Sequence, residues 1–394
     1  MAGSTFGSHF RITTWGESHG TGIGVVADGC PAGLSLNESD IQQFLDRRKP
    51  GQSRYSTPRK EGDKVKILSG VFEGRTTGTP VSLAVFNENQ RSQDYGDIAS
   101  YYRPGHADFT FDAKYGFRDY RGGGRSSGRE TIGRVAAGAI AVKILNQLGI
   151  SFLTYARSIG PVTIPQSAQD LLTAFGSKDS NSFATLQEQI LTNPVFMPDE
   201  DCARKAECYL EECMRRTDSA GGVVECIITG VPAGIGEPVF DKLDANLAKA
   251  IFSIGAVKGF EIGDGFLSAS ATGSENNDSF LIEHGRPITA SNHAGGILGG
   301  ISSGAPLVFR AAFKPTPSIA APQRTITQAR EEISISIHGR HDPVIVPRAV
   351  VVVECMAALT LLDLLLENTG ARMDSLEKLY RADKQTSKTF QELK

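Results

Sequence analysis

The chain has 394 residues, of which 40% are hydrophobic and 22% charged, enough apolar material for one large domain or two ordinary ones. With 41 basic and 44 acidic side chains the formal net charge is −3, which gives no overall reason to expect binding to nucleic acid or a membrane. The N-terminus lacks the apolar stretch of a secretory signal and the six cysteines form no CxxC pair, so we expect a cytoplasmic protein with reduced thiols and no metal site.

Hydrophobic periodicity predicts a mixture of strands and helices. The predicted strands cover residues 11–15, 22–28, 65–72, 81–86, 223–228, 307–313 and 344–346. The predicted helices cover residues 38–48, 130–148, 201–216, 241–254 and 350–367. Glu354 and Asp363 interrupt the last and most apolar of these, which favours a buried helix over a membrane span. The mixture indicates an α/β or α+β fold.

Two distant segments follow the same plan. GVVADGCPAGLSLNESDIQQFLDRR begins at residue 24, and VECIITGVPAGIGEPVFDKLDANLAKAI begins at residue 224. Each reads as a strand, a G-x-P-A-G turn and an amphipathic helix; the tripeptide alone could arise by chance, but the shared order favours duplication. We expect two similar halves packed as one domain over residues 1–370, with an insertion at about 163–200. The charged tail, 371–394, is expected to be loosely ordered.

Arginine is concentrated in one segment, RDYRGGGRSSGRETIGR at residues 118–134. Ser127 and Glu130 have the spacing of a capping box at the start of the helix, and three glycines precede it. Free N–H groups and the positive end of the helix dipole favour an anion there. The arginines that would surround it are Arg121, Arg125, Arg129 and Arg134. A capped helix with solvated arginines is the structural alternative, but the combination favours anion binding.

Other segments carry candidate residues that are individually weak signals. His19 lies in the turn of TTWGESHGTGIG, and His106 follows Arg-Pro-Gly, although lone histidines are often structural. Arg47 suits the C-terminal end of its helix, whereas Arg54 and Arg59 lie in the polar loop beyond it and could gather anions.

A later part of the chain is rich in glycine and turns. The run SNHAGGILGGISSG could leave room for a flat ligand against the backbone, and KPTPS at 314–318 offers a cation and hydroxyls. Arg340 and Asp342 provide opposite charges in IHGRHDP. Tight turns and a surface ion pair would explain any one of these pieces alone.

Together these segments resemble the chorismate synthase family from Phe6 to about Leu365. The matching motifs are GESHG at 16–20, DRRKPGQS at 46–53, RPGHAD at 103–108, GGGRSSGRET at 122–131, NPVFMPD at 193–199, GGILGGISSG at 295–304, KPTPSI at 314–319 and GRHDP at 339–343. The resemblance implies a β-α-β sandwich with helices packed between two sheets, assembled as a homotetramer. It also implies a lyase of the shikimate pathway and of aromatic amino acid biosynthesis.

The implied reaction is the 1,4-elimination of phosphate from 5-enolpyruvylshikimate 3-phosphate, which gives chorismate. It requires reduced FMN without net redox change, and NADPH would act only indirectly as a reductant. The chain has no room for a flavin reductase domain, so we expect an external reductant. The substrate carries roughly four negative charges near neutral pH, which would explain the local concentration of arginine.

The resemblance also assigns residues to roles. The catalytic residues would be His19, His106, Asp342, Ser18 and Ser127. The FMN-binding residues would be Arg125, Ser126, Ser127, Gly255, Ala256, Gly299, Lys314, Pro315, Thr316, Pro317, Ser318 and Arg340. Substrate or NADPH would be bound by Arg48, Arg54, Arg129 and Arg134, and Arg340 would also face the substrate.

The implied chemistry divides the proton transfers among three of these residues. His19 would protonate the departing phosphate and His106 the reduced flavin near N1, while Asp342 would help N5 take the C6 proton. Ser18 and Ser127 would orient the network. Both imidazoles would use a pKa near ~6.5, at which they hold a proton at neutral pH and still release it.

Two other functions compete with this one. A true oxidoreductase on the same scaffold would consume reduced flavin stoichiometrically. An RNA-binding module would use Arg/Gly elements, but only one such element occurs and the net charge is negative.

Overall fold

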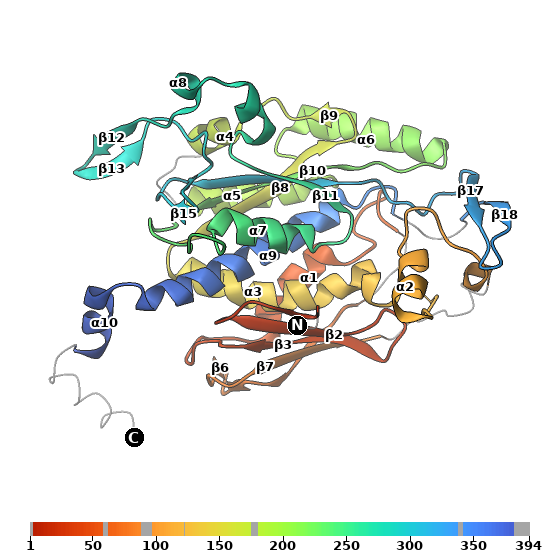
Figure 1. Ribbon diagram of the computed structural model, residues 1–394, viewed down its shortest axis with the longest axis horizontal. Helices are drawn as coiled ribbons and strands as arrows, with labels where there is room; N and C mark the ends of the chain where they lie inside the picture. Colours follow the sequence, from red (N-terminus) through yellow and green to blue (C-terminus); the bar gives the residue numbers. More distant parts are fainter. Residues whose placement is uncertain are drawn as a thin grey trace.

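A computed structural model of the chain describes residues 3–57, 62–87, 97–121, 123–174, 180–337 and 342–381. In these ranges two five-stranded sheets enclose a layer of helices, which Figure 1 shows as lower sheet, middle helices and upper sheet. This is the mixed helix and sheet fold that the sequence predicts.

The first sheet is formed by the N-terminal part of the chain. Its strands, in spatial order, are β1 (Thr5–Phe6), β2 (Arg11–Gly16), β3 (Gly22–Asp28), β7 (Val81–Phe86) and β4 (Val65–Ser69). All neighbours are antiparallel. In β2, Ile12 and Thr14 are buried while their neighbours are not, the alternation of a sheet with one face on the core.

The second sheet is formed by the C-terminal part. Its strands, in spatial order, are β11 (Val257–Ile262), β16 (Leu307–Phe313), β10 (Gly222–Thr229), β8 (Ser151–Ile159) and β9 (Val162–Thr163). These strands also pair antiparallel.

Four helices fill the layer between the sheets. They are α1 (Glu38–Arg48), α3 (Thr131–Gln147), α7 (Leu243–Phe252) and α9 (Val346–Glu367). Helix α9 is long and apolar enough to cross a membrane, but 83% of its most apolar window is buried inside the protein, so it is the core helix that the sequence predicts. Its buried Glu354 accepts from both terminal nitrogens of Arg47 in α1, at 3.0 and 2.6 Å, which compensates its burial.

The order of elements confirms the predicted duplication. The first half runs β2, β3, α1, β4, β7, α3, and the second half runs β8, β10, α7, β11, β16, α9. The spatial orders β2-β3-β7-β4 and β8-β10-β16-β11 correspond strand for strand. The two G-x-P-A-G segments therefore follow the central strand of each sheet.

The halves meet where α3 packs on α9. A Cβ atom placed on Gly138 would lie 2.2 Å from Cβ of Cys355 and 2.8 Å from its Cα. Only glycine allows the two helix backbones to approach this closely.

The remaining elements lie at the edges and outside the sandwich. They are α2 (Asp108–Tyr115), α4 (Ala168–Ala174), α5 (Ser180–Thr192), α6 (Glu200–Arg215), α8 (Gly273–Asn276), α10 (Met373–Tyr380), and the hairpins β5–β6 (Val71–Phe72, Arg75–Thr76), β12–β13 (Phe280–Glu283, Arg286–Thr289), β14–β15 (Ile297–Leu298, Ile301–Ser302) and β17–β18 (Gln323–Ile326, Glu332–Ile335). Helices α4 and α6 lie on the outer side of the second sheet (Figure 1). The segment predicted as an insertion, at about 163–200, contains the end of β9 and helices α4 and α5.

Two predicted strands are wrong in detail. Residues 344–346 make one isolated bridge from Val344 to Ala220 before α9 begins at Val346. The strand predicted at 65–72 is divided at Gly70, whose φ of +83° bends the chain away from β7. The pattern also missed β8 and β11, because β8 is buried on both faces and shows no alternation.

Candidate active site

Several of the predicted functional segments meet at the end of the sandwich where α3 begins, on the right in Figure 1. Arg48, the last residue of α1, donates to the carbonyl of Gly128 at 3.1 Å. Arg134 in the first turn of α3 reaches Ser253, which caps α7, at 2.5 Å. Arg348 at the start of α9 donates to the carbonyl of Arg48 at 3.0 Å. Elements of both halves therefore enclose one site.

The entry into α3 differs from the predicted capping box. Ser127 caps a short 3₁₀ turn, Gly128–Glu130, by accepting from the backbone N–H of Arg129 at 3.3 Å, and α3 follows directly. The carboxylate of Glu130 instead accepts from Arg134 Nε at 2.7 Å and from the Thr14 hydroxyl at 3.0 Å. Glu130 thus orients an arginine of the site, and the reciprocal half of the capping box is wrong.

Two predicted ligand-binding arginines share one buried carboxylate. Asp63 lies 2.7 Å from Arg48 Nη1 and 3.2 Å from Arg129 Nη1. Arg48 is 1% exposed, and its other nitrogens donate to Thr131 and Gly128. Burial lowers the pKa of Arg48 to about 10, against the opposing effect of Asp63. One carboxylate for two guanidinium groups leaves net positive charge beside α3.

The carboxylate of Glu130 is likewise shared by two other arginines. Arg134 binds it at 2.7 Å, and Arg125 Nη2 lies 3.8 Å from it. Arg125 also donates to Gly16 O and to the Thr14 hydroxyl, so its side chain follows the end of β2. These contacts place Arg125 and Arg134 on the same side of the helix start.

The turn that carries Ser18 and His19 lies beside this cluster. Asn87 donates to the carbonyls of Glu17 and Gly20 at 3.2 and 2.8 Å, and its own carbonyl accepts from Arg129 at 2.7 Å. Ser18 is 8% exposed. Arg121 binds Asp119, and this hydrogen bond, with a smaller effect of His19, lowers the pKa of Asp119.

His106 is placed by two hydrogen bonds. Its Nδ1 lies 3.0 Å from Pro104 O and its Nε2 lies 2.8 Å from the Ser318 hydroxyl. Burial, with the positive charges of Arg103 and Lys314, lowers the pKa of His106 to about 4. His106 is therefore neutral at neutral pH in this state, which differs from the expected imidazole that already holds a proton.

The KPTPS segment runs beside His106. Lys314 donates from Nζ to Gly105 O at 2.6 Å, and its backbone N–H donates to Ala256 O at 2.9 Å. Ala256 has a φ of +74°, so the turn with Gly255 is held in a conformation unusual for a side-chain-bearing residue. Among the described residues, the buried hydroxyl of Thr316 has no hydrogen-bond partner.

Ser126 lies in the glycine-rich turn that precedes α3. Its hydroxyl donates to Gly123 O at 2.7 Å, within the 3₁₀ turn that precedes Ser127.

Asp342 lies near Arg48 and Arg348, at the start of α9. It accepts from the Thr57 backbone N–H at 2.7 Å and from Arg348 Nη1 at 2.5 Å. Arg348 in turn reaches Arg48 O, so Asp342 joins the network at the start of α9.

Two predicted residues among those that the structure describes are not gathered here. Arg54 turns away to pair with Glu211 of α6 at 2.5 Å. Gly299 lies next to Gly300, whose carbonyl accepts from Leu243 at the first residue of α7, whereas the site lies beyond the last residue. The ten residues of α7 separate these places by roughly 15 Å. Arg340 and Arg59 lie outside the described residues.

Sequence reasoning missed three side chains that organise the site. Asp63, Asn87 and Arg348 connect the predicted residues to one another. Arg348 could have been noticed as an isolated cation at the start of an apolar helix. Asp63 and Asn87 lie in loops without a motif, and nothing in the sequence reveals their partners.

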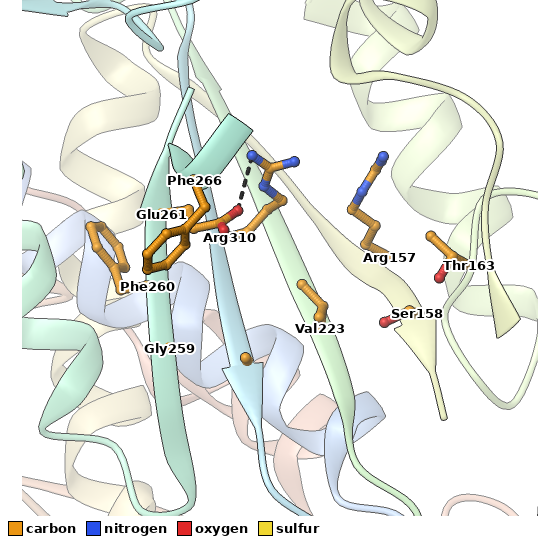
Figure 2. Close-up of a pocket in the computed structure, with 10 residues that line it drawn as sticks. Arg157, Ser158, Thr163, Val223, Gly259, Phe260, Glu261, Phe266 and Arg310 are labelled. Atoms are coloured by element: carbon orange, nitrogen blue, oxygen red, sulfur yellow. Dashed lines mark ion pairs between the residues drawn. The ribbon is translucent and has the colours of Figure 1, made fainter. Parts of the chain in front are cut away.

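A different hollow lies on the second sheet. A cavity of about 310 Å³ is lined by Arg157 of β8, Arg310 of β16 and Phe266, among others (Figure 2). Its two arginines are paired with Glu225 and Glu261, at 3.2 and 3.1 Å. It contains none of the predicted site residues, and each guanidinium already has its own carboxylate.

The comparisons with known proteins agree on one family. A family model described as chorismate synthase matches residues 10–366. The chorismate synthase of Agathobacter rectalis is 65% identical over 381 residues, covering 97% of this chain and 100% of that protein. The chorismate synthase of Methanosarcina mazei is 54% identical over 369 residues, covering 93% and 97%.

Structure comparison gives the same result. A crystal structure of a chorismate synthase matches with a TM-score of 0.74 and 31% sequence identity, over 95% of this chain and 97% of that chain. The chain therefore belongs to the chorismate synthase family, whose members are lyases of the shikimate pathway.

Proposed function

We propose that the site at the start of α3 binds 5-enolpyruvylshikimate 3-phosphate and eliminates its phosphate to give chorismate. The observation that carries the proposal is the excess of guanidinium groups over carboxylates at this end of the sandwich. Asp63 is shared by Arg48 and Arg129, and Glu130 by Arg125 and Arg134. A substrate with two carboxylates and a phosphate would supply the missing negative charge.

The arginines would differ in whether they contact the substrate directly. Arg129 and Arg134 border the helix start and would contact the substrate directly, as would Arg340 by the family resemblance. Each guanidinium nitrogen of Arg48 donates to a protein group, so its role here would be to hold Asp63 and the Gly128 turn. Arg54 would reach the substrate, or NADPH, only after leaving α6.

The residues present fit reduced FMN. Within the described part of the chain the buried hydroxyl of Thr316 has no hydrogen-bond partner, and Lys314 is partly exposed, so both would suit a ligand with polar edges and a phosphate. The turn at Gly255 and Ala256, the hydroxyls of Ser126 and Ser127 and the side chain of Arg125 complete this set. When bound, the reduced flavin supplies electron density that assists C–O cleavage and is recovered at the end. Gly299 would have to come from another copy of the chain, in the homotetramer that we propose.

The protein's own groups would handle the protons. His19, beside Ser18, would donate to the departing phosphate, and Asp342 would assist the removal of the C6 proton. His106 is neutral before ligands bind, but an anion placed near its ring would raise its pKa. Binding of the anionic ligands would therefore protonate His106, which later delivers this proton. Ser318 would hold Nε2 of His106 in place. Ser127 would help to orient the proton-transfer network.

The test is an anaerobic assay with photoreduced FMN and the enolpyruvyl substrate. We expect many chorismate molecules per reduced flavin, because the reaction has no net redox change. Product equal to the flavin consumed would identify an oxidoreductase instead.

A second assay addresses the reductant. We propose that the enzyme works in the cytoplasm with an external flavin reductant. NADPH with oxidised FMN alone should then give no chorismate, and robust formation would contradict this.

A further inference from the structure

The loop that follows α1, residues 49–57, has both ends at the active site and its middle on α6. At one end the carbonyl of Arg48 accepts from Arg348 at 3.0 Å. At the other end the Thr57 N–H donates to Asp342 at 2.7 Å. Between these ends, Arg54 and Tyr55 contact carboxylates of α6.

Tyr55 is the buried anchor of the loop. It is 1% exposed, and its hydroxyl donates to Glu207 at 3.0 Å while accepting from Arg54 Nε at 2.7 Å. Burial, with the hydrogen bond to Glu207, raises the pKa of Tyr55 to about 12. Tyr55 therefore keeps its proton, and the direction of both hydrogen bonds is fixed.

Arg54 is held less firmly on the same helix. Its Nη2 lies 2.5 Å from Glu211 and 3.4 Å from Glu207, and its guanidinium group lies 4.8 Å from the ring centre of Tyr55. The Arg54 side chain is 64% exposed. Exposed ion pairs of this kind are weak, so a more strongly charged partner can displace them.

The loop also has space behind it. A cavity of about 260 Å³ is lined by Ser53 and Ser56 of the loop, by Asn193 and Phe196, and by Arg348, among others. Tyr55 packs in the hydrophobic core, whereas the side chain of Arg54 beside it is exposed and is held on α6 by polar contacts. Arg54 lies three residues before Thr57, which lets the chain between them span at most about 10 Å.

We propose that Glu207 and Glu211 are positioning residues that set the affinity of the active site for its substrate. They hold Arg54 on α6, and the substrate anion must compete with them for this guanidinium group. The inference rests on the proposed function in one respect, because Arg54 must contact the substrate. It gives α6, which follows the predicted insertion, a part in the reaction without contact to any reacting atom.

The test replaces one carboxylate and compares it with its neighbour. Glu211→Gln removes the charge that binds Arg54, and Glu212→Gln is the matched control. Glu212 lies on the same helix with comparable exposure, and its ion pair with Arg216 is long, at 3.7 Å. We expect Glu211→Gln to lower the KM for the enolpyruvyl substrate about 2- to 5-fold with kcat unchanged, because a released exposed ion pair is worth that much. Glu212→Gln should leave both constants unchanged.

Two further variants tie the effect to Arg54. Glu207→Gln should lower KM less than Glu211→Gln, since Glu207 lies farther from the guanidinium group. In an Arg54→Gln background, Glu211→Gln should have no effect, because nothing remains to be released. A purely structural role of the carboxylates would raise KM or lower the melting temperature instead.

The outcomes separate this inference from the proposed function. Absence of chorismate formation by the unaltered protein would refute the function. Normal turnover, with Glu211→Gln no different from Glu212→Gln or with an increased KM, would refute the role of α6 alone. The same decrease in KM in the Arg54→Gln background would also refute it.

Discussion

The two halves of the molecule share a topology but contribute differently to the site. In each half the last helix places an arginine in its first turn, and this arginine reaches the end of a helix in the other half. Arg134 of α3 contacts Ser253 at the end of α7, and Arg348 of α9 contacts the carbonyl of Arg48 at the end of α1. The duplication therefore built the scaffold and also the contacts that close it.

The difference lies in what precedes these helices. Helix α3 is preceded by the glycine- and arginine-rich turn, and its carboxylate partners leave unbalanced positive charge. Helix α9 begins with Val346 and Pro347 and continues as a buried apolar helix. One half thus supplies most of the charge, while the other supplies the core helix and the segment at 314–318. In the function that we propose, the reacting groups lie on loops at the end where the halves meet.

The largest expected effect comes from reversing the charge at the α3 contact. Arg134→Glu would place a carboxylate beside Glu130 and remove a guanidinium group that we propose to bind the substrate. We expect kcat/KM to fall by about 10³ or more, as for loss of a partly buried charge-assisted interaction. Steady-state kinetics and substrate titration measure it.

Its control is Arg204→Glu, an exposed cation on α6 that pairs with its own helix. This variant should keep wild-type kinetics. Normal substrate affinity in Arg134→Glu would show that the substrate site is elsewhere.

A smaller effect should follow from separating the halves. Gly138→Ala would introduce a Cβ 2.2 Å from Cβ of Cys355 and force α3 and α9 apart. We expect a loss of about 1–3 kcal/mol in the free energy of unfolding, the usual cost of overpacking. Urea denaturation measures it.

Gly273→Ala serves as the reference, because an added Cβ there meets no atom within 4 Å. Its effect should stay within about 0.5 kcal/mol. Equal stability of the two variants would contradict the close approach of α3 and α9 at Gly138.

The last effect, which is small within any one pH unit, concerns the pH dependence of stability. His106 has a pKa of about 4 in the folded state and an ordinary value of 6.5, so folding favours its neutral form. Its contribution is fully present above about pH 6.5 and is lost as the pH falls towards 4, with a slope of about 1 kcal/mol per pH unit. His106→Gln should flatten this part of the unfolding curve. An unchanged slope in the variant would contradict the buried, neutral imidazole.

Much of this arrangement could be predicted from the sequence. The duplicated strand–turn–helix pattern predicted the two halves, and the arginine-rich turn predicted an anion site at a helix start. What could not be predicted were the partners, since Asp63 and Asn87 reach the site only through tertiary folding. The pKa of His106 likewise depends on burial and on distant cations, which no local pattern records. Gly299 was assigned by resemblance, but the hydrogen bond from the Leu243 N–H to the neighbouring Gly300 carbonyl places it at the end of α7 away from the site.

The most direct test is a structure of the protein with 5-enolpyruvylshikimate 3-phosphate and FMN bound. The account predicts that the substrate lies between the halves, with its anionic groups on Arg129 and Arg134 and the flavin beside Lys314 and Thr316. Ligands bound instead in the cavity of Arg157 and Arg310 on the second sheet would contradict it.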